Sequence, residues 1–365
     1  MNRSAVVATC AAVVVTAGAV TAVAAPAPHQ PNQQPPACTG DPATAHRLDL
    51  TVDGVRTFGY YAVPAKRAKG IVVFDHGYGH TAWNWRQHLS QVAARDGVIA
   101  VAMDYHGQTD TAVNPKTGLS SSRGWRVQEG ADDSIAAAKL FDRSCKTGGV
   151  NSIYGVSMGG NTSGLVVAAK PTRANGKPLF NYWFAIEPAA NVTETWAEAT
   201  AIAQSGNTFG TQAAADIEAE MGGTPQTAPA AYQSHTVVAR TADIAAAGLA
   251  GVSVVQGVDD GLVPYNQSRE LVAALRAERM TVDDVTAGTR GDGEPGTTLS
   301  GNVLGPVGQQ SPFAGHGSEV SNSQLVIETG FAQLDNLYLH NQPPGCFESV
   351  RDGDTGQWLV SPATC

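Results

Sequence analysis

The sequence predicts an α/β fold in which a mostly parallel, twisted sheet carries helices on both faces. Continuous apolar runs that end in glycine, such as residues 70–77 (GIVVFDHG), are typical of strands buried on both sides. These runs alternate along the chain with segments of helical periodicity, such as residues 127–143. Because a strand that is followed by a helix pairs in parallel with the next strand, this alternation implies a sheet between two helix layers.

The predicted elements follow one another in a regular order. Residues 46–64 contain two alternating runs on either side of Asp53 and Gly54, which predicts a hairpin with a tight turn. Further strands are expected at residues 70–77, 97–107, 149–155, 179–188, 251–257 and 280–288. Helices are expected at residues 82–95, 127–143, 158–170, 265–278 and 318–340.

Two long segments interrupt this alternation. Residues from about 189 to 250 carry no strand signal and contain short Ala-rich helical stretches. We interpret them as a helical insert between strands 6 and 7, either a cap over one end of the sheet or ordinary packing helices. Residues 287–315 are rich in glycine and predict a long irregular excursion.

The N-terminal residues have the pattern of a secretory signal. Arg3 precedes an apolar run, and cleavage after Ala24 would satisfy the small-residue rule for signal removal. Residues 25–44 are rich in Pro and Gln and form the expected leader to a domain at 45–340. No later stretch is apolar enough to span a bilayer, so we expect a secreted, extracellular protein without a stable membrane anchor.

The charge balance excludes one class of partner. Without residues 1–24, which contain Arg3 and no acid, 22 Lys and Arg face 32 Asp and Glu, a formal charge of −10. A negative surface repels polyanions, so nucleic acid is not an expected partner. The sequence contains no signal for an oligomeric state.

Four cysteines remain after the signal, at positions 38, 145, 346 and 365. In an exported protein they predict two disulfides, for which three pairings are possible. We favour Cys346 with Cys365, which would pin the tail at 341–365, and hence Cys38 with Cys145. The spacing lacks the C-x-x-C pairs of a zinc site.

Ser157 lies in a G-x-S-x-G pattern between a predicted strand and a predicted helix. A serine on such a turn raises its hydroxyl above the sheet, and glycines at 155 and 159 avoid collisions with the neighbouring backbone. The helix N-terminus favours developing negative charge. Because a free hydroxyl is a poor nucleophile, a base must take its proton and an acid must orient that base.

At this point the chain resembles the α/β-hydrolase superfamily of serine esterases, lipases and peptidases. The resemblance covers roughly residues 45–340 and includes the family's chain order of Ser, Asp and His. It depends on four stretches, HGYG at 76–79, GVSMGG at 155–160, QGVDDGLVPYNQS at 256–268 and AGHG at 314–317. The resemblance implies an α/β-hydrolase fold.

The resemblance also implies a role for each matched residue. Ser157 would be the nucleophile, His316 the general base and Asp260 the acid that orients the base. The backbone amides of Tyr78 and Met158 would form the oxyanion hole. Each such donor typically contributes about 10²–10³-fold in rate.

Two further acids compete with Asp260. Asp259 is adjacent to it and could instead cap the turn into the next helix. Glu187 ends the preceding strand, where some lipases of the superfamily place their acid, and would otherwise be a polar residue lining the site. We rank Asp260 ahead of both.

Histidines and aromatic residues near the oxyanion loop have alternative roles as well. His76 and His80 are four residues apart, but the glycines between them argue against a helical metal pair, so we expect no metal and interpret His76 as a loop brace. Tyr78, Trp83 and Trp85 could wall an acyl pocket, although for the two tryptophans we favour packing of a helix on the sheet.

The sequence thus predicts a secreted serine hydrolase that cleaves carboxylic esters through an acyl-enzyme and needs no cofactor. Its substrate would be a small, lipid or polymeric ester. A serine peptidase similar to the prolyl-oligopeptidase branch is the alternative, although the long N-terminal propeller that many members of that branch carry is absent. A non-catalytic binding protein with a hydrolase fold is a third hypothesis.

Overall fold

The structure is a computed structural model that describes residues 36–115, 120–258, 260–289, 316–319, 324–353 and 355–365. Asp259 and the glycine-rich excursion at 290–315 lie outside the described residues. The N-terminal 35 residues, which include the expected signal, also lie outside them.

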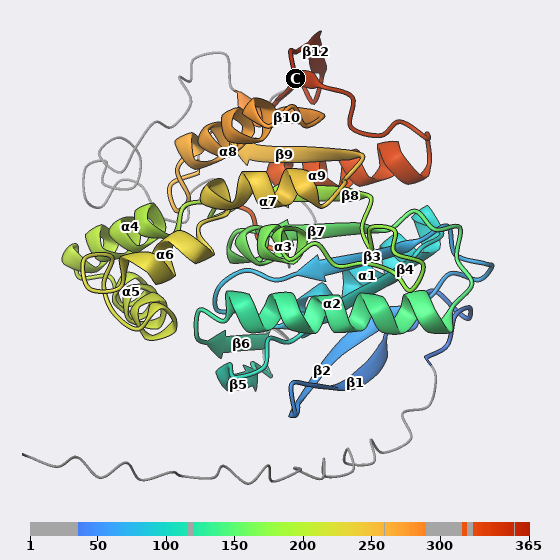
Figure 1. Cartoon of the computed structure of the whole chain (residues 1–365), viewed down its shortest axis with the longest axis horizontal. Helices are drawn as coiled ribbons and strands as arrows, with labels where there is room; N and C mark the ends of the chain where they lie inside the picture. Colours follow the sequence, from blue (N-terminus) through green and yellow to red (C-terminus); the bar gives the residue numbers. More distant parts are fainter. Residues whose placement is uncertain (1–35, 116–119, 259, 290–315, 320–323, 354) are drawn as a thin grey trace, which may run out of the picture. The chain divides into compact units, whose positions relative to one another are not determined.

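Ten strands of the described chain form one sheet (Figure 1), in the order β1-β2-β4-β3-β7-β8-β9-β10-β11-β12. The pairs from β4 through β11 are parallel, whereas β1–β2, β2–β4 and β11–β12 are antiparallel. The strands of this sheet are β1 (His46–Val52), β2 (Val55–Ala62), β3 (Ile71–Asp75), β4 (Ile99–Met103), β7 (Ser152–Val156), β8 (Tyr182–Ile186), β9 (Gly251–Gly257), β10 (Val282–Thr289), β11 (Phe347–Asp352) and β12 (Trp358–Pro362). The mostly parallel sheet predicted from the sequence is confirmed.

Helices cover both faces of this sheet, as predicted. One face packs against α1 (Ala82–Asp96) and α9 (Leu325–Tyr338), and the other packs against α2 (Val127–Ser144), α3 (Met158–Ala168) and α8 (Tyr265–Ala277). Alternate residues of each buried strand enter one core or the other. In β3, for example, Val72 and Phe74 contribute to the α1 and α9 core, whereas Ile71 and Val73 contribute to the opposite core.

Between β8 and β9 the chain forms a run of helices. They are α4 (Val192–Gln204), α5 (Thr208–Met221), α6 (Pro229–His235), the 3₁₀ helix η1 (Val237–Arg240) and α7 (Thr241–Ala246). Figure 1 shows α4, α5 and α6 beyond the carboxyl ends of the parallel strands. Because side chains at those ends form the sites of α/β folds, the insert stands over the position where a site is expected.

Two small β elements have no counterpart among the predicted elements. Residues Thr109–Val113 (β5) and Ser120–Arg123 (β6) pair as a separate hairpin. The C-terminal tail, expected to be pinned by the Cys346–Cys365 disulfide, forms β11 and β12 and widens the sheet. Asp283 on β10 holds this tail, since its carboxylate accepts the backbone N–H groups of Gly345 and Phe347 at 3.0 and 2.9 Å.

Two disulfides join Cys38 to Cys145 and Cys346 to Cys365, the two pairs favoured from the sequence. The first connects the segment before β1 to the end of α2, across 107 positions of the chain. The second closes the β11–β12 hairpin across 19 positions. A separate finding is that none of the helices in the described part of the chain has the length and apolar character needed to cross a membrane.

We predict that the two disulfides stabilise the fold unequally. The long loop closed by Cys38–Cys145 removes more unfolded-chain entropy than the loop of Cys346–Cys365, by about 1.5 kcal/mol in the chain-entropy account. Urea unfolding of the Cys38→Ala/Cys145→Ala and Cys346→Ala/Cys365→Ala variants should therefore show a larger loss of free energy of unfolding in the first. Equal losses would contradict this prediction.

Candidate active site

Ser157 lies on a sharp turn between β7 and α3. Its backbone has φ 59° and ψ −122°, a conformation that is unusual for a residue with a side chain. The turn requires glycine on both sides. A Cβ at position 155 would lie 2.0 Å from the carbonyl oxygen of Gly159, and one at position 159 would lie 2.1 Å from that of Asp75. The Ser157 N–H donates to the Ile186 carbonyl at 2.9 Å, which fixes the turn against β8.

Asp260 and His316 form a close pair although 56 positions separate them. Nδ1 of His316 lies 2.8 Å from Oδ2 of Asp260. Because a carboxylate only accepts, Nδ1 carries a proton and donates it, and Nε2 is left to act as a base. Oδ1 of Asp260 accepts the N–H groups of Leu262 and Val263 at 2.8 and 2.9 Å, so the buried carboxylate is held from the turn that follows β9.

Ser157 and His316 line the same pocket. Asp260 is absent from the described lining of this pocket, and it contacts the ring nitrogen of His316 that carries the proton. Burial opposes the charged imidazolium, but the charge of Asp260 and its hydrogen bond raise the pKa of His316 to about 9. The arrangement offers a hydroxyl and an oriented imidazole to any molecule bound in that pocket.

Glu187 supplies a second buried carboxyl group to this pair. It directly follows β8 with a positive φ of 46°, and its Oε2 lies 3.6 Å from Nδ1 of His316. The same oxygen accepts the backbone N–H of Gly317. Burial, and then the negative charge of Asp260, raise the pKa of Glu187 well above its usual value. The raised pKa favours the neutral form of Glu187, and the hydrogen bond of His316 Nδ1 goes to Asp260.

Glu187, Asp260 and His316 are also the described residues whose metal-ligand atoms gather, all within 4.8 Å of one another. Their hydrogen bonds account for this proximity. Nδ1 of His316 donates to Asp260, and the second carboxyl accepts from Gly317. A metal ion at this point would displace the proton on Nδ1 that orients the imidazole.

The predicted oxyanion loop, HGYG at 76–79, approaches Ser157 closely. A Cβ placed on Gly77 would lie 3.6 Å from the Cβ of Ser157. The next residue, Tyr78, therefore lies beside the candidate nucleophile, and its side chain lines the pocket. Met158 is the first residue of α3 and directly follows Ser157. These positions bring both predicted oxyanion donors next to Ser157.

Glu319 is a site residue that sequence reasoning missed. Its carboxylate is 1% exposed, accepts the N–H of Gly77 at 2.9 Å and lies 2.8 Å from Nδ1 of His80. Burial opposes its charge, but His80 outweighs this effect and lowers the pKa of Glu319 to about 2. Glu319 thus ties the loop that precedes α9, which also contains His316, to the oxyanion loop.

The two predicted loop histidines differ in character. His76 is fully buried and stacks on Tyr105 with ring centroids 3.9 Å apart, and burial lowers its pKa to about 4. It is therefore neutral and braces the loop, as the sequence suggested. His80 is instead paired with Glu319, and this pairing raises its pKa. The only clue to this ion pair in the sequence was an acid, Glu319, three residues after His316.

The structure places Trp83 and Trp85 against the sheet, not around Ser157. Neither belongs to the described lining of the two pockets that contain Ser157. Trp85 is fully buried between α1 and the sheet, 5.0 Å from the ring of Phe74, and Trp83 packs edge-on against Tyr60. Both positions belong to α1, whose apolar side packs on the sheet, so helix packing decides their place.

A second, apolar pocket adjoins Ser157 from the side of the insert. Its aromatic walls are Tyr78, Trp125 and Phe209, and α4 and α5 complete it with aliphatic side chains such as Ile202. Asp216 on α5 ties the insert to the rest of the site. Its carboxylate accepts the Tyr78 hydroxyl at 2.5 Å and two nitrogens of Arg123 at 2.9 Å.

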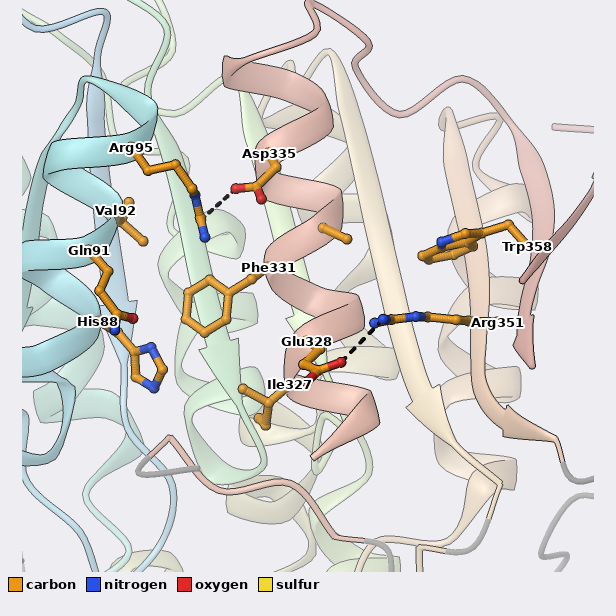
Figure 2. A pocket seen from close by; sticks show the side chains of 11 residues that line it. His88, Gln91, Val92, Arg95, Ile327, Glu328, Phe331, Asp335, Arg351 and Trp358 are labelled. Atoms are coloured by element: carbon orange, nitrogen blue, oxygen red, sulfur yellow. Dashed lines mark hydrogen bonds and ion pairs between the residues drawn. The ribbon is translucent and has the colours of Figure 1, made fainter. Parts of the chain in front are cut away.

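Another groove lies elsewhere, between α1, α9 and the C-terminal hairpin (Figure 2). Figure 2 shows Phe331 between the two helices and two ion pairs along the groove, Arg95 with Asp335 and Arg351 with Glu328. Its described lining includes none of the residues around Ser157. This groove is therefore separate from the candidate active site.

The sequence matches no family model and no curated protein. Similar solved structures include an acylaminoacyl peptidase of Pyrococcus horikoshii, at 14% identity and a TM-score of 0.47, covering 65% of this chain and 36% of that chain. A dipeptidyl peptidase 4 of Porphyromonas gingivalis is 14% identical with a TM-score of 0.45, and the match covers 66% of this chain and 31% of that chain. A thermostable esterase from Pseudomonas putida is 15% identical with a TM-score of 0.47, and the match covers 67% of this chain and 72% of that chain. This chain thus spans about a third of each peptidase.

Two of these neighbours are peptidases and one is an esterase. In this chain, β3, β7, β8, β9 and β10 are successive parallel neighbours, and Ser157 lies on the strand-to-helix turn after β7. The residues that approach Ser157 come from the ends of β3 and β9 and from the loop before α9. By this architecture, the chain has the α/β-hydrolase fold.

Proposed function

We propose that this chain is a secreted serine hydrolase that cleaves carboxylic esters through an acyl-enzyme. The observation that carries the proposal is the contact of His316 with the buried Asp260, together with the position of His316 in the lining of the same pocket as Ser157. A nucleophile, a base and an orienting acid in this relation are the minimum that acyl transfer by serine requires.

Acylation would begin with attack of Ser157 Oγ on the ester carbonyl carbon. The hydroxyl proton moves to Nε2 of His316, and Asp260 stabilises the imidazolium that forms. The carbonyl oxygen becomes negative and accepts hydrogen bonds from the backbone N–H groups of Tyr78 and Met158. Met158 is the first residue of α3, so the helix dipole also favours this negative charge. When the C–O bond to the alcohol breaks, the imidazolium returns the proton to the leaving oxygen.

Deacylation would repeat these steps with water. His316 takes a proton from water, the hydroxide equivalent attacks the acyl carbon, and the bond to Ser157 Oγ breaks. The imidazolium then returns the proton to Oγ, which restores the free enzyme and releases the carboxylic acid. Each cycle consumes one ester and one water and needs no redox partner.

Export is part of the proposal. The apolar run after Arg3 followed by small residues supports a cleaved secretory signal. The two disulfides support an oxidising compartment, because such bonds are rare where cytosolic thiols are kept reduced.

Replacement of Ser157 by Ala should abolish activity. We expect hydrolysis of p-nitrophenyl butanoate to fall by at least about 10⁴-fold, since the nucleophile is lost and only binding and oxyanion contacts remain. A fluorophosphonate probe should label the wild type and the exposed-site control Ser234→Ala, but not Ser157→Ala. Labelling that persists in Ser157→Ala would contradict the assignment.

The same assay tests the choice between ester and peptide. The proposal expects turnover of p-nitrophenyl esters and none of aminoacyl anilides. Faster cleavage of the anilides would instead support the peptidase alternative. Folded wild type that neither reacts with the probe nor cleaves either substrate would support a binding protein.

The two buried acids should respond differently to substitution. Asp260→Asn removes the charge that orients His316, so kcat should fall by about 10³–10⁴-fold. Glu187→Gln copies the neutral, protonated side chain and should lower kcat by less than about 10-fold. Steady-state kinetics on p-nitrophenyl butanoate compare them. A larger loss in Glu187→Gln than in Asp260→Asn would assign the orienting acid to Glu187.

A further inference from the structure

The apolar pocket beside Ser157 contains one buried acid, Glu198 on α4. Glu198 is 2% exposed, and its Oε2 has no hydrogen-bond partner among the described residues. An unpaired oxygen of this kind is costly to bury, so it is rare unless a ligand completes it. Because Glu198 lines the pocket that also contains Ser157, a bound substrate can reach it.

The charges near Glu198 are negative. Glu194, one turn earlier on α4, and Asp260 both act on it electrostatically, and burial together with these charges raises its pKa to about 8. Among the described residues that line the pocket, none is Lys, Arg or His. The described part of the chain therefore gives Glu198 no cation inside the pocket, although the negative potential there favours one.

The geometry of the two pockets indicates which half of an ester meets Glu198. Because His316 must return a proton to the leaving alcohol, the alcohol has to lie next to His316, in the pocket that this residue lines. The described lining of the insert-side pocket includes Ser157 but not His316. The acyl group therefore occupies the insert-side pocket and points toward α4.

We propose that Glu198 makes this pocket a subsite for a short acyl group that ends in a positively charged amine. The inference rests on the proposed ester hydrolysis and names its substrate class. The ammonium group would donate a hydrogen bond to Oε2 of Glu198, and its charge would hold the carboxyl in the ionised form. The free volume of about 40 Å³ favours a chain of few carbons.

Two esters of equal shape test the proposal. p-Nitrophenyl 3-aminopropanoate and p-nitrophenyl butanoate differ only in an ammonium group in place of a terminal methyl group. Their ratio of kcat/KM, amine over butanoate, cancels differences in the amount of active enzyme. In Glu198→Gln this ratio should fall by at least about 10-fold relative to wild type, because a charge-assisted hydrogen bond is lost.

Glu194→Gln is the matched control. It removes an equal charge one turn away, but Glu194 is partly exposed, accepts the amide of Asn266 at 2.6 Å and is not part of the described pocket lining. Its ratio should stay within about 3-fold of wild type, as expected for a screened charge. An unchanged ratio in Glu198→Gln, or equal falls in both variants, would overturn the proposal.

A measurement on the wild type covers the case in which Glu198→Gln does not fold. Butylammonium and 1-butanol have the same chain length, and each is tested as a competitive inhibitor of butanoate hydrolysis at pH 7. The ammonium should bind at least about 10-fold more tightly, corresponding to one charge-assisted contact. Equal inhibition constants would overturn the subsite.

Failure of the subsite and failure of the proposed function give different results. If the butanoate ester is cleaved and Ser157 is labelled, but the ratio does not depend on Glu198, only the subsite is wrong. If wild type cleaves neither ester and the probe does not label it, ester hydrolysis itself is wrong.

Discussion

The contact between the imidazole of His316 and the carboxylate of Asp260 is the interaction on which the rest of the site depends. It joins the turn after β9 to the loop before α9, and the order of strands in the sheet brings both beside Ser157. Asp260 is 1% exposed and is held by the N–H groups of Leu262 and Val263. Water therefore competes little for this hydrogen bond, which keeps Nε2 available as a base.

The site stabilises one negative charge beside His316 although two carboxyl groups are present. Like charges at close range cannot both ionise cheaply, so burial and then the charge of Asp260 raise the pKa of Glu187. A third acid, Glu319, is charged because His80 faces it. Glu198 differs from all of these, since neither a cation nor a donor on the described chain meets its Oε2. The environment of each acid thus assigns it a separate task.

The sequence predicted the parts of this structure that follow from local pattern. The buried strands could be inferred from the periodicity of apolar residues, and the glycines around Ser157 from the steric demand of the turn. Both cysteine pairs could be inferred because only four cysteines had to be paired. Glu319 and Glu198 could not, since their importance arises only when distant segments pack together. For Trp85 the sequence favoured packing on the sheet but left a place beside the pocket open, because an aromatic residue on a helix can pack toward either. The β11–β12 hairpin depends on Asp283, which the pattern did not reveal.

The most direct test of this account is the pH dependence of the rate at which a fluorophosphonate inactivates the enzyme. Only the neutral imidazole can accept the proton of Ser157, so a raised pKa delays reactivity to higher pH. We expect the rate to rise with a midpoint near pH 9 in wild type and at a lower pH in Asp260→Asn. A midpoint near the unperturbed histidine value of about 6.5, unchanged in Asp260→Asn, would contradict the central role of the His316–Asp260 contact.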